Sequence, residues 1–226
     1  MNGDPVAALD QRGREQLQTV LGLLAEERAS VSSVVDKRAW RVHVVDSLTG
    51  LEVAELRQAS RIVDVGAGAG FPGLALAVAL AEAQVDLIES VGRKCEFMRR
   101  AIEAAEIPNA TVHNARSEEW AAAEGREGYE VVTARAVGRL STLAELASPL
   151  LKPNGVLVAW KGKRDPEEER QLADASEALA MRPEQILDVG NRAGSEHRHL
   201  HLIRKSGPTP GDLPRRPGMA KKRPRG

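Results

Sequence analysis

The chain has 226 residues, and its 32 lysines and arginines balance its 32 aspartates and glutamates, so the formal net charge is zero. A single cysteine, Cys95, excludes a disulfide framework and a cysteine-based zinc site. Aromatic residues make up only 3%, too few for a platform that stacks single-stranded RNA, and no uncharged apolar run of about 18 residues could span a membrane. The N-terminus lacks the pattern of a signal peptide, so we expect a cytoplasmic protein that does not interact with membranes.

The zero net charge conceals two regions of opposite sign. Residues 204–226 contain eight basic residues and one acid, whereas the rest of the chain has an excess of seven acids. An acidic body with a basic end favours a polyanionic partner that binds through this end. Residues 206–226 also contain five prolines and no apolar periodicity. We therefore expect this tail to be extended or disordered when free.

The first 60 residues show the apolar spacing of helices. Apolar side chains recur every three or four residues in two stripes, Leu17, Val20, Leu21 and Leu24, then Val42, Val45, Leu48 and Leu51. A break between the stripes is expected near Ser30 to Asp36, and no strand pattern occurs. Residues 1–60 are predicted to form a helical N-terminal lobe.

From residue 61 onward, strand patterns alternate with helix patterns. Strands are predicted at 61–66, 85–90, 110–115, 129–136, 156–162, 184–190 and 197–205. Helices are predicted at 73–83, 93–107, around 118–124, at 140–151 and at 165–180, where Pro166 occupies the first turn. A turn is predicted from Lys152 to Gly155.

This order predicts an α/β doubly wound sheet with right-handed crossovers. The last two strands have only a short connection, so we expect them to pair antiparallel. A parallel sheet that ends in such a pair is the outline of the class I S-adenosylmethionine-dependent methyltransferase fold, which is Rossmann-like. The methyltransferase domain is expected to span 61–205, between the helical lobe 1–60 and the basic tail 206–226.

A glycine-rich loop follows the first of these strands. Gly66, Gly68 and Gly70 alternate after Asp64, and Glu89 ends the next strand. Glycines let the backbone approach a ligand closely, and an acid in the position of Glu89 accepts the hydroxyls of a ribose. The pattern predicts a site for an adenosine-containing cofactor, and a tight turn without a ligand is the less favoured alternative.

Two cofactors are compatible with this loop. Gly68, Gly70 and Gly73 also match the fingerprint of dinucleotide-binding proteins, in which a pyrophosphate lies at the turn. The carboxylate of Asp64 would repel a pyrophosphate, but it favours the ammonium and sulfonium of S-adenosylmethionine, directly or through water. The residues favour S-adenosylmethionine, with a dinucleotide-dependent regulatory module as the alternative.

Several specific runs extend over nearly the whole chain. They are WRVHVVDSL at 40–48, IVDVGAGAGFPGL at 62–74, LIES at 87–90, RK at 93–94, RSEE at 116–119, ARA at 134–136, WKG at 160–162, RHL at 198–200 and PRRPG at 214–218. Through them the chain resembles the ribosomal RNA small subunit methyltransferase G family (GidB). It departs from the family at Ala134, where a serine is frequent, and at 219–222, where many relatives have a second proline.

The resemblance implies transfer of a methyl group from S-adenosylmethionine to N7 of one guanine in 16S rRNA, in the small ribosomal subunit or its assembly intermediate. It implies that Arg135 lies between cofactor and RNA and is the catalytic residue. The cofactor contacts that it implies are Asp64, Gly66, Gly68, Gly70, Phe71, Glu89, Ser117, Glu118 and Arg135. The RNA contacts proposed beside them are His43, Lys161, Arg198, Arg215, Arg216, Lys221 and Lys222.

Methylation at guanine N7 requires no general base, because N7 has a lone pair and no proton to lose. Proximity, orientation and electrostatics are then sufficient. The chain has no Asn/Asp-Pro-Pro-Tyr/Phe motif for exocyclic amines, and Cys95 falls in a helix pattern, away from a strand-end loop. A methyltransferase for a small molecule or another RNA is an alternative that the basic tail disfavours.

Three further expectations concern histidines and the tail. His43 and Asp46 share a helix face, and they either line the RNA entrance or form satisfied internal hydrogen bonds in the N-terminal lobe. His197, His199 and His201 alternate along one strand, and no metal site is expected from them. Removal of residues 206–226 is expected to weaken RNA binding and to leave cofactor binding intact.

Overall fold

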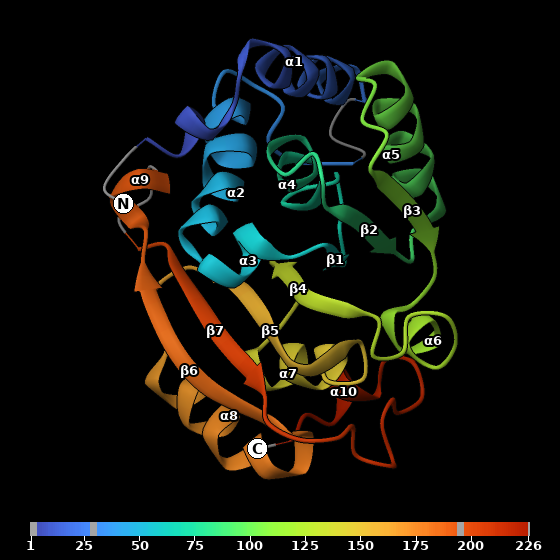
Figure 1. Cartoon of the computed structure of the whole chain (residues 1–226), viewed down its shortest axis with the longest axis vertical. Coiled ribbons are helices and arrows are strands. Elements are labelled where there is room, and N and C mark those ends of the chain that lie inside the picture. The colour runs from blue at the N-terminus through green and yellow to red at the C-terminus, as the bar shows by residue number, and fades with distance from the viewer. Residues whose placement is uncertain (1–3, 28–30, 194–196, 226) are drawn as a thin grey trace.

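A computed structural model describes residues 4–27, 31–193 and 197–225, and within these ranges seven strands form one mixed sheet (Figure 1). The strand order is β3-β2-β1-β4-β5-β7-β6. The strands are β1 (Arg61–Val65), β2 (Gln84–Glu89), β3 (Ala110–Asn114), β4 (Tyr129–Arg135), β5 (Leu151–Lys161), β6 (Met181–Asp188) and β7 (His199–Lys205). Strands β1 to β5 pair in parallel, and β7 pairs antiparallel with both β5 and β6. The predicted closing pair is confirmed.

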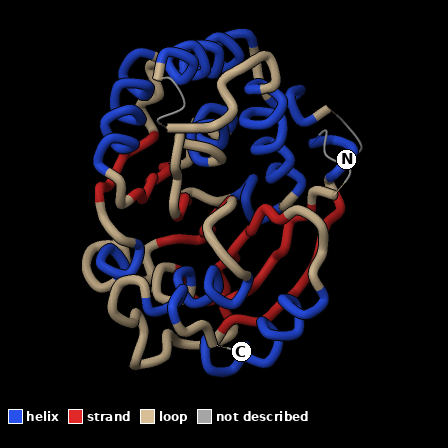
Figure 2. Tube along the Cα trace, turned by 180° about the vertical axis from the view of Figure 1, so that it is seen from behind, coloured by secondary structure: helices blue, strands red, loops and turns tan. Residues whose placement is uncertain are grey.

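Helices cover both faces of this sheet, as the view from behind also shows (Figure 2). The longer ones are α1 (Gln11–Glu26), α4 (Gly73–Ala79), α5 (Gly92–Ala104), α7 (Leu140–Ala147) and α8 (Pro166–Leu179). The short ones are η1 (Pro5–Ala8), η2 (Trp40–Val45, a π-helix), α2 (Asp46–Leu48), η3 (Thr49–Glu52), α3 (Ala54–Gln58), α6 (Ser117–Ala121), α9 (Gly190–Ala193) and α10 (Met219–Lys222). None of the helices within the described ranges is long and apolar enough to cross a membrane.

The two faces of the sheet contribute to two separate apolar clusters because side chains alternate along each strand. Ile62 packs in one cluster with α1, α4 and α5, and Val63 packs in the other with α7 and α8. Burial on both faces explains why apolar residues predominate in the central strands. The N-terminal residues Leu17 and Leu24 are fully buried in the first cluster, so the N-terminal segment packs on the sheet through a shared core.

Two local expectations differ from the structure, and a third falls partly outside the described residues. The turn predicted from Lys152 to Gly155 lies inside β5. There the pairing of β5 with β4 changes register between Tyr129 and Val131 of β4, and Asn154 has a φ of +65°. These residues therefore form an irregularity within a longer strand, and the prediction of a separate turn is wrong. The helix expected over 73–83 ends at Ala79. The break expected from Ser30 begins outside the described residues, and from Val31 onward it is an irregular connection.

The expectation of an extended tail is also wrong. Residues 206–225 pack against the body beside α6 and α7 (Figure 1), and they include the short helix α10. Leu213 and Ala220 are buried, with exposed fractions of 3% and 2%. The guanidinium of Arg215 forms two hydrogen bonds with Glu145, at 2.5 and 2.6 Å. Two apolar anchors, an ion pair and hydrogen bonds to the body thus hold a proline-rich segment that lacks periodicity.

Candidate functional site

The glycine loop lies at the carboxyl ends of β1, β2 and β4, where parallel α/β sheets bind their ligands. Gly66, Gly68 and Gly70 have φ values of +68°, +61° and +90°, a region that side chains disfavour. A Cβ on Gly66 would lie 2.7 Å from Val137, so this position also needs glycine for packing. A Cβ on Gly68 would meet nothing closer than 3.8 Å, so its backbone faces open space that a ligand could occupy.

Asp64 is buried beneath the glycine loop and connects it to β4. Its two carboxylate oxygens accept hydrogen bonds from the N–H of Gly73 at 3.0 Å and from the hydroxyl of Thr133 at 2.9 Å. Burial raises the pKa of Asp64 from 3.8 to about 7, although these two hydrogen bonds and the charge of Arg135 oppose the shift. Asp64 is 1% exposed and does not line the pocket described below. Its position is therefore that of a support for the loop.

Glu89 ends β2 and turns its carboxylate toward the same loop. One oxygen accepts a hydrogen bond from the N–H of Gly68 at 3.1 Å, and the other accepts one from the N–H of Val91 at 2.8 Å. These bonds fix the side chain at the edge of a pocket that it lines. A carboxylate that is already oriented can accept ribose hydroxyls with little loss of entropy.

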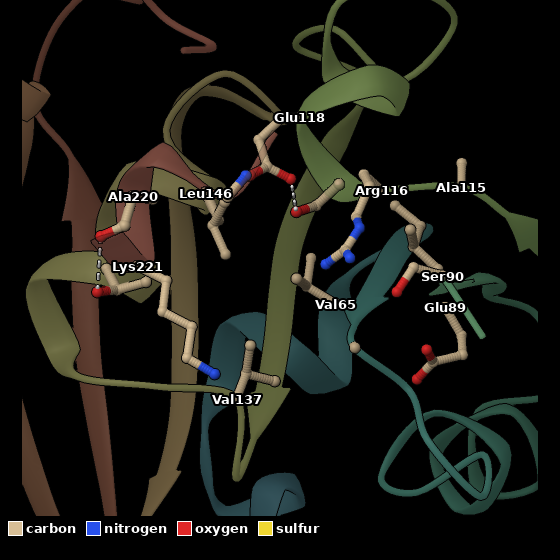
Figure 3. Close-up of a pocket in the computed structure, with 15 residues that line it drawn as sticks. Val65, Glu89, Ser90, Ala115, Arg116, Glu118, Val137, Leu146, Ala220 and Lys221 are labelled. Atoms are coloured by element: carbon tan, nitrogen blue, oxygen red, sulfur yellow. Dashed lines mark hydrogen bonds between the residues drawn. The ribbon is translucent and has the colours of Figure 1, made fainter. Parts of the chain in front are cut away.

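The pocket extends from the glycine loop toward α6 and the C-terminal segment (Figure 3). On its inner side it is lined by Val65, Gly66, Ile88 and Glu89, and on its outer side by Ser90, Ala115, Arg116, Ser117, Glu118, Val137, Thr142, Leu146, Gly218, Ala220 and Lys221. Ser117 donates a hydrogen bond to one oxygen of Glu118 at 3.2 Å, and the other oxygen accepts one from the N–H of Gly218 at 2.7 Å. The lining of this cavity therefore combines backbone groups, carboxylates and apolar side chains, and such a lining suits an adenosine.

A network of charged residues lies at the end of β4. The Nη1 group of Arg135 donates hydrogen bonds to the carboxylate of Asp46 at 2.8 Å and to the carbonyl of Val42 at 3.0 Å. Arg198, just before β7, places its Nε 2.7 Å from the other oxygen of Asp46. The Asp46 side chain is only 3% exposed, so two arginines share one buried carboxylate. This network connects the N-terminal segment to both β4 and the antiparallel pair.

His43 lies on the other side of the glycine loop. Its ring stacks on Phe71 with a centroid distance of 5.1 Å and an interplanar angle of 21°. Burial lowers the pKa of His43 below its usual value, and the charge of Arg135 contributes in the same direction. The imidazole is therefore neutral at neutral pH and packs against the loop, while its Nε2 lies 2.9 Å from the carbonyl of Val34. It does not bond to Asp46 among the interactions of the described residues.

The basic residues expected to contact RNA fall into two groups. Lys161 is paired with Glu168 at 2.6 Å, Arg198 with Asp46 and Arg215 with Glu145, so these three cations are already engaged inside the protein. The other group is exposed at the surface and consists of Arg216, Lys221 and Lys222. Of the lysines and arginines expected to contact RNA, those that are exposed at the surface therefore all lie on the C-terminal segment.

The described residues include no group of three or more histidines, cysteines or acids arranged to hold a metal ion. Burial lowers the pKa of His201 to about 4, which indicates a histidine packed neutral in the sheet. The thiol of Cys95 is buried in α5 and donates a hydrogen bond to the carbonyl of Glu89 at 3.2 Å. Although it lies close to the end of β2, it is fully buried and therefore not accessible to a substrate as a nucleophile.

Comparison with known proteins identifies the family. The family described as rRNA small subunit methyltransferase G matches residues 15–201. The ribosomal RNA small subunit methyltransferase G of Bacillus subtilis strain 168 is 34% identical over 221 residues, which cover 96% of this chain and 92% of the relative. The chain belongs to the rRNA small subunit methyltransferase G family.

Another relative agrees with this family, and solved structures agree with the fold. The methyltransferase G of Rubrobacter xylanophilus is 43% identical over 187 residues, which cover 80% of this chain and 71% of the relative. A crystal structure of a SAM-dependent methyltransferase from Aquifex aeolicus matches the fold with a TM-score of 0.55 and 16% identity, over 75% of this chain and 94% of that one. The expected class I methyltransferase fold is thereby confirmed.

Two features of this methyltransferase G chain were not expected from the sequence. Gly218, Ala220 and Lys221 line the pocket, although the tail was expected only to contact RNA. Asp46 is the shared partner of Arg135 and Arg198, which lie far from it in the sequence. The RHL and PRRPG runs gave a signal that these segments matter, but no pattern in them indicates which residues they contact.

Proposed function

We propose that this chain transfers a methyl group from S-adenosylmethionine to N7 of one specific guanine in the 16S rRNA of the small ribosomal subunit. The observation that carries the proposal is the oriented carboxylate of Glu89, which lines the pocket and accepts a hydrogen bond from the N–H of Gly68 in the glycine loop, in a chain of the methyltransferase G family. Since the described helices include none that could cross a membrane and ribosomal subunits are cytoplasmic, we propose that it acts in the cytoplasm.

The residues of the pocket and of the adjacent glycine loop fit this cofactor. The backbone at Gly68 leaves room for a ligand, and Gly66 and Phe71 belong to the same loop. Glu89 is oriented to accept the ribose hydroxyls, and Ser117 and Glu118 line the side that suits the adenine. A buried acid such as Asp64, with a pKa near neutral, would be favoured in its charged form by a nearby cationic ligand.

The cofactor, when bound, supplies a methyl group activated by a positively charged sulfur. The protein then has to hold the guanine in line with that methyl group and to exclude water, because N7 already presents a free lone pair. A neutral His43 and a buried Cys95 agree with a reaction that needs neither a general base nor a covalent cysteine. Positioning and electrostatics would provide the rate enhancement.

Arg135 is the residue we propose to act at the junction of cofactor and RNA. Among the described residues its hydrogen bonds all come from Nη1, so Nε and Nη2 are available to a ligand. Its side chain is 12% exposed, so only a small part of the guanidinium-bearing side chain reaches the surface. A cation fixed by Asp46 in this way can orient a phosphate or a carboxylate without reorganising during the reaction.

The experiment uses methyl-labelled S-adenosylmethionine, the purified chain and two substrates, assembled small subunits and naked 16S rRNA, both from cells without an endogenous enzyme of this family. We expect one labelled guanine, at which the RNA strand becomes sensitive to the chemical cleavage specific for 7-methylguanosine. The Arg135→Ala variant serves as the control for adventitious enzyme. A label on another atom or another base, or label only in small molecules, would refute the proposal.

A further inference from the structure

The C-terminal segment is anchored to the body at three places on the same side of the protein. Arg215 pairs with the buried carboxylate of Glu145, and the N–H of Gly218 donates to Glu118. The hydroxyl of Thr142 in α7 donates to the carbonyl of Ala220 at 3.2 Å. These contacts position residues 218–221, which we call the C-terminal wall, in a defined place.

The C-terminal wall lies across the pocket from the glycine loop. Gly218, Ala220 and Lys221 line the same cavity as Gly66 and Glu89. Figure 3 shows the side chain of Lys221 reaching from the segment toward Val137, the residue that covers Gly66. The wall borders the pocket together with Val137 and with Thr142 and Leu146 of α7, whereas α6 and the end of β2 contribute other lining residues.

Glu118 makes the relation between wall and cofactor site specific. Its carboxylate bridges the hydroxyl of Ser117, at the start of α6, and the N–H of Gly218, in the wall. A ligand that contacts Ser117 and Glu118 therefore contacts groups that are positioned by the wall. Conversely, undocking of the wall would leave Glu118 without the partner that fixes it.

We propose that the C-terminal wall is part of the S-adenosylmethionine site, so that tight cofactor binding requires the segment to be docked. The inference rests on the proposed function for the identity of the ligand. It replaces the separation of roles expected from the sequence, in which the tail binds RNA and the body alone binds cofactor. Because Arg215 is engaged by Glu145, its main contribution is to dock the segment.

The first test uses the unaltered full chain. Amide hydrogen exchange of residues 218–222 is followed with and without S-adenosylmethionine, and α8, which contributes no residue to the pocket, is the internal control. Since a ligand that binds only the docked state stabilises it, saturation at 100 times Kd should slow exchange of the wall by up to about 100-fold. Exchange in α8 should change little. Equal exchange rates of the wall with and without bound cofactor would overturn the proposal.

The second test uses variants and isothermal calorimetry. A chain that ends at Pro217 lacks the wall, and Ala220→Phe replaces a buried alanine with a side chain too large for its place. Both should bind S-adenosylmethionine at least tenfold more weakly, whereas Arg223→Gln, an exposed change in the same segment that does not line the pocket, should bind like the unaltered chain. Circular dichroism checks that each variant is folded, and Ala220→Phe keeps the test decisive if the shortened chain does not fold.

The outcomes separate the two proposals. If the unaltered chain does not bind S-adenosylmethionine, the proposed function fails. If it binds the cofactor and the folded variants bind it equally well, the proposed function stands and the wall is refuted. Loss of RNA binding without loss of cofactor affinity would return the tail to the role expected from the sequence.

Discussion

The carboxyl group of Asp64 makes a measurable prediction about stability and pH. It is fully buried beneath the glycine loop, and burial raises its pKa from 3.8 to about 7 in the folded protein. A group whose pKa is raised on folding stabilises the protein most below its unfolded pKa. That contribution is lost as the pH rises through the folded pKa. Asp64 should therefore make the cofactor-free protein progressively less stable between about pH 4 and pH 7, relative to a neutral residue at the same place.

The substitution Asp64→Asn isolates this effect. The asparagine oxygen can accept from the N–H of Gly73, and its amide can donate to the hydroxyl of Thr133, so both contacts of the native side chain have a counterpart. Each pKa unit corresponds to about 1.36 kcal/mol. With pKa values of 3.8 and about 7, the stability of the variant relative to the native chain should increase by about 2–3 kcal/mol from pH 5 to pH 8.

Urea unfolding of both chains, without cofactor, at half-unit steps of pH measures this difference. Other titrating groups contribute equally to the two chains and cancel, apart from the neighbouring charges of Arg135 and Glu89, which act on Asp64 itself. In thermal unfolding the same change corresponds to about 4–12 °C for a chain of this size. A difference that stays flat from pH 5 to pH 8 would show that Asp64 is ionised in the folded state and would refute the reasoning.

Four further substitutions test the site and its support. Arg135→Ala should lower methylation by at least about 100-fold with the fold retained, measured by initial rates and circular dichroism, and an unchanged rate would contradict the role at the junction. Gly66→Ala should lower the unfolding free energy by about 1–2 kcal/mol in urea unfolding, because Gly66 has a positive φ and Val137 lies close to it. Gly68→Ala lies beside open space, so it should affect cofactor affinity more strongly than stability. A larger loss of stability in Gly68→Ala than in Gly66→Ala would contradict the assigned positions. Lys205 is completely buried and pairs with Glu127. The hydrogen bond from its ammonium lowers the pKa of Glu127 to about 2, so the native protein should lose stability as the pH falls toward 2. Glu127→Gln should lower the unfolding free energy by about 1–3 kcal/mol at pH 7, and no loss in urea unfolding would rule out this pair as a support.

The linear order of elements was predictable because strands and helices are specified by local patterns. The short, mainly apolar run at 61–66 marks a strand buried on both faces, and the glycines that follow mark the turn into α4. Glu89 could be assigned to the same site because the carboxyl ends of neighbouring parallel strands meet at one edge of the sheet. The family was also recognisable from sequence, since its runs extend over nearly the whole chain.

The partners of the charged residues were decided by the tertiary structure. Arg135 pairs with a residue 89 positions away, and Gly218 bonds to one 100 positions away. A basic residue in a sequence can equally face solvent, RNA or a buried acid, and no local pattern distinguishes these cases. For the same reason the raised pKa of Asp64 was not predictable, because its largest cause is burial by elements from elsewhere in the chain.

The C-terminal segment shows this division most clearly. Its composition determined its charge and its lack of periodicity, and both hold in the structure. Whether it extends or docks depends on a few specific contacts, namely buried Leu213 and Ala220 and the pair of Arg215 with Glu145. Such contacts need only one matching residue each on the body, so they leave no periodic trace in the sequence. The sequence alone therefore determined the fold and the family, and the tertiary structure decided which segments enclose the site.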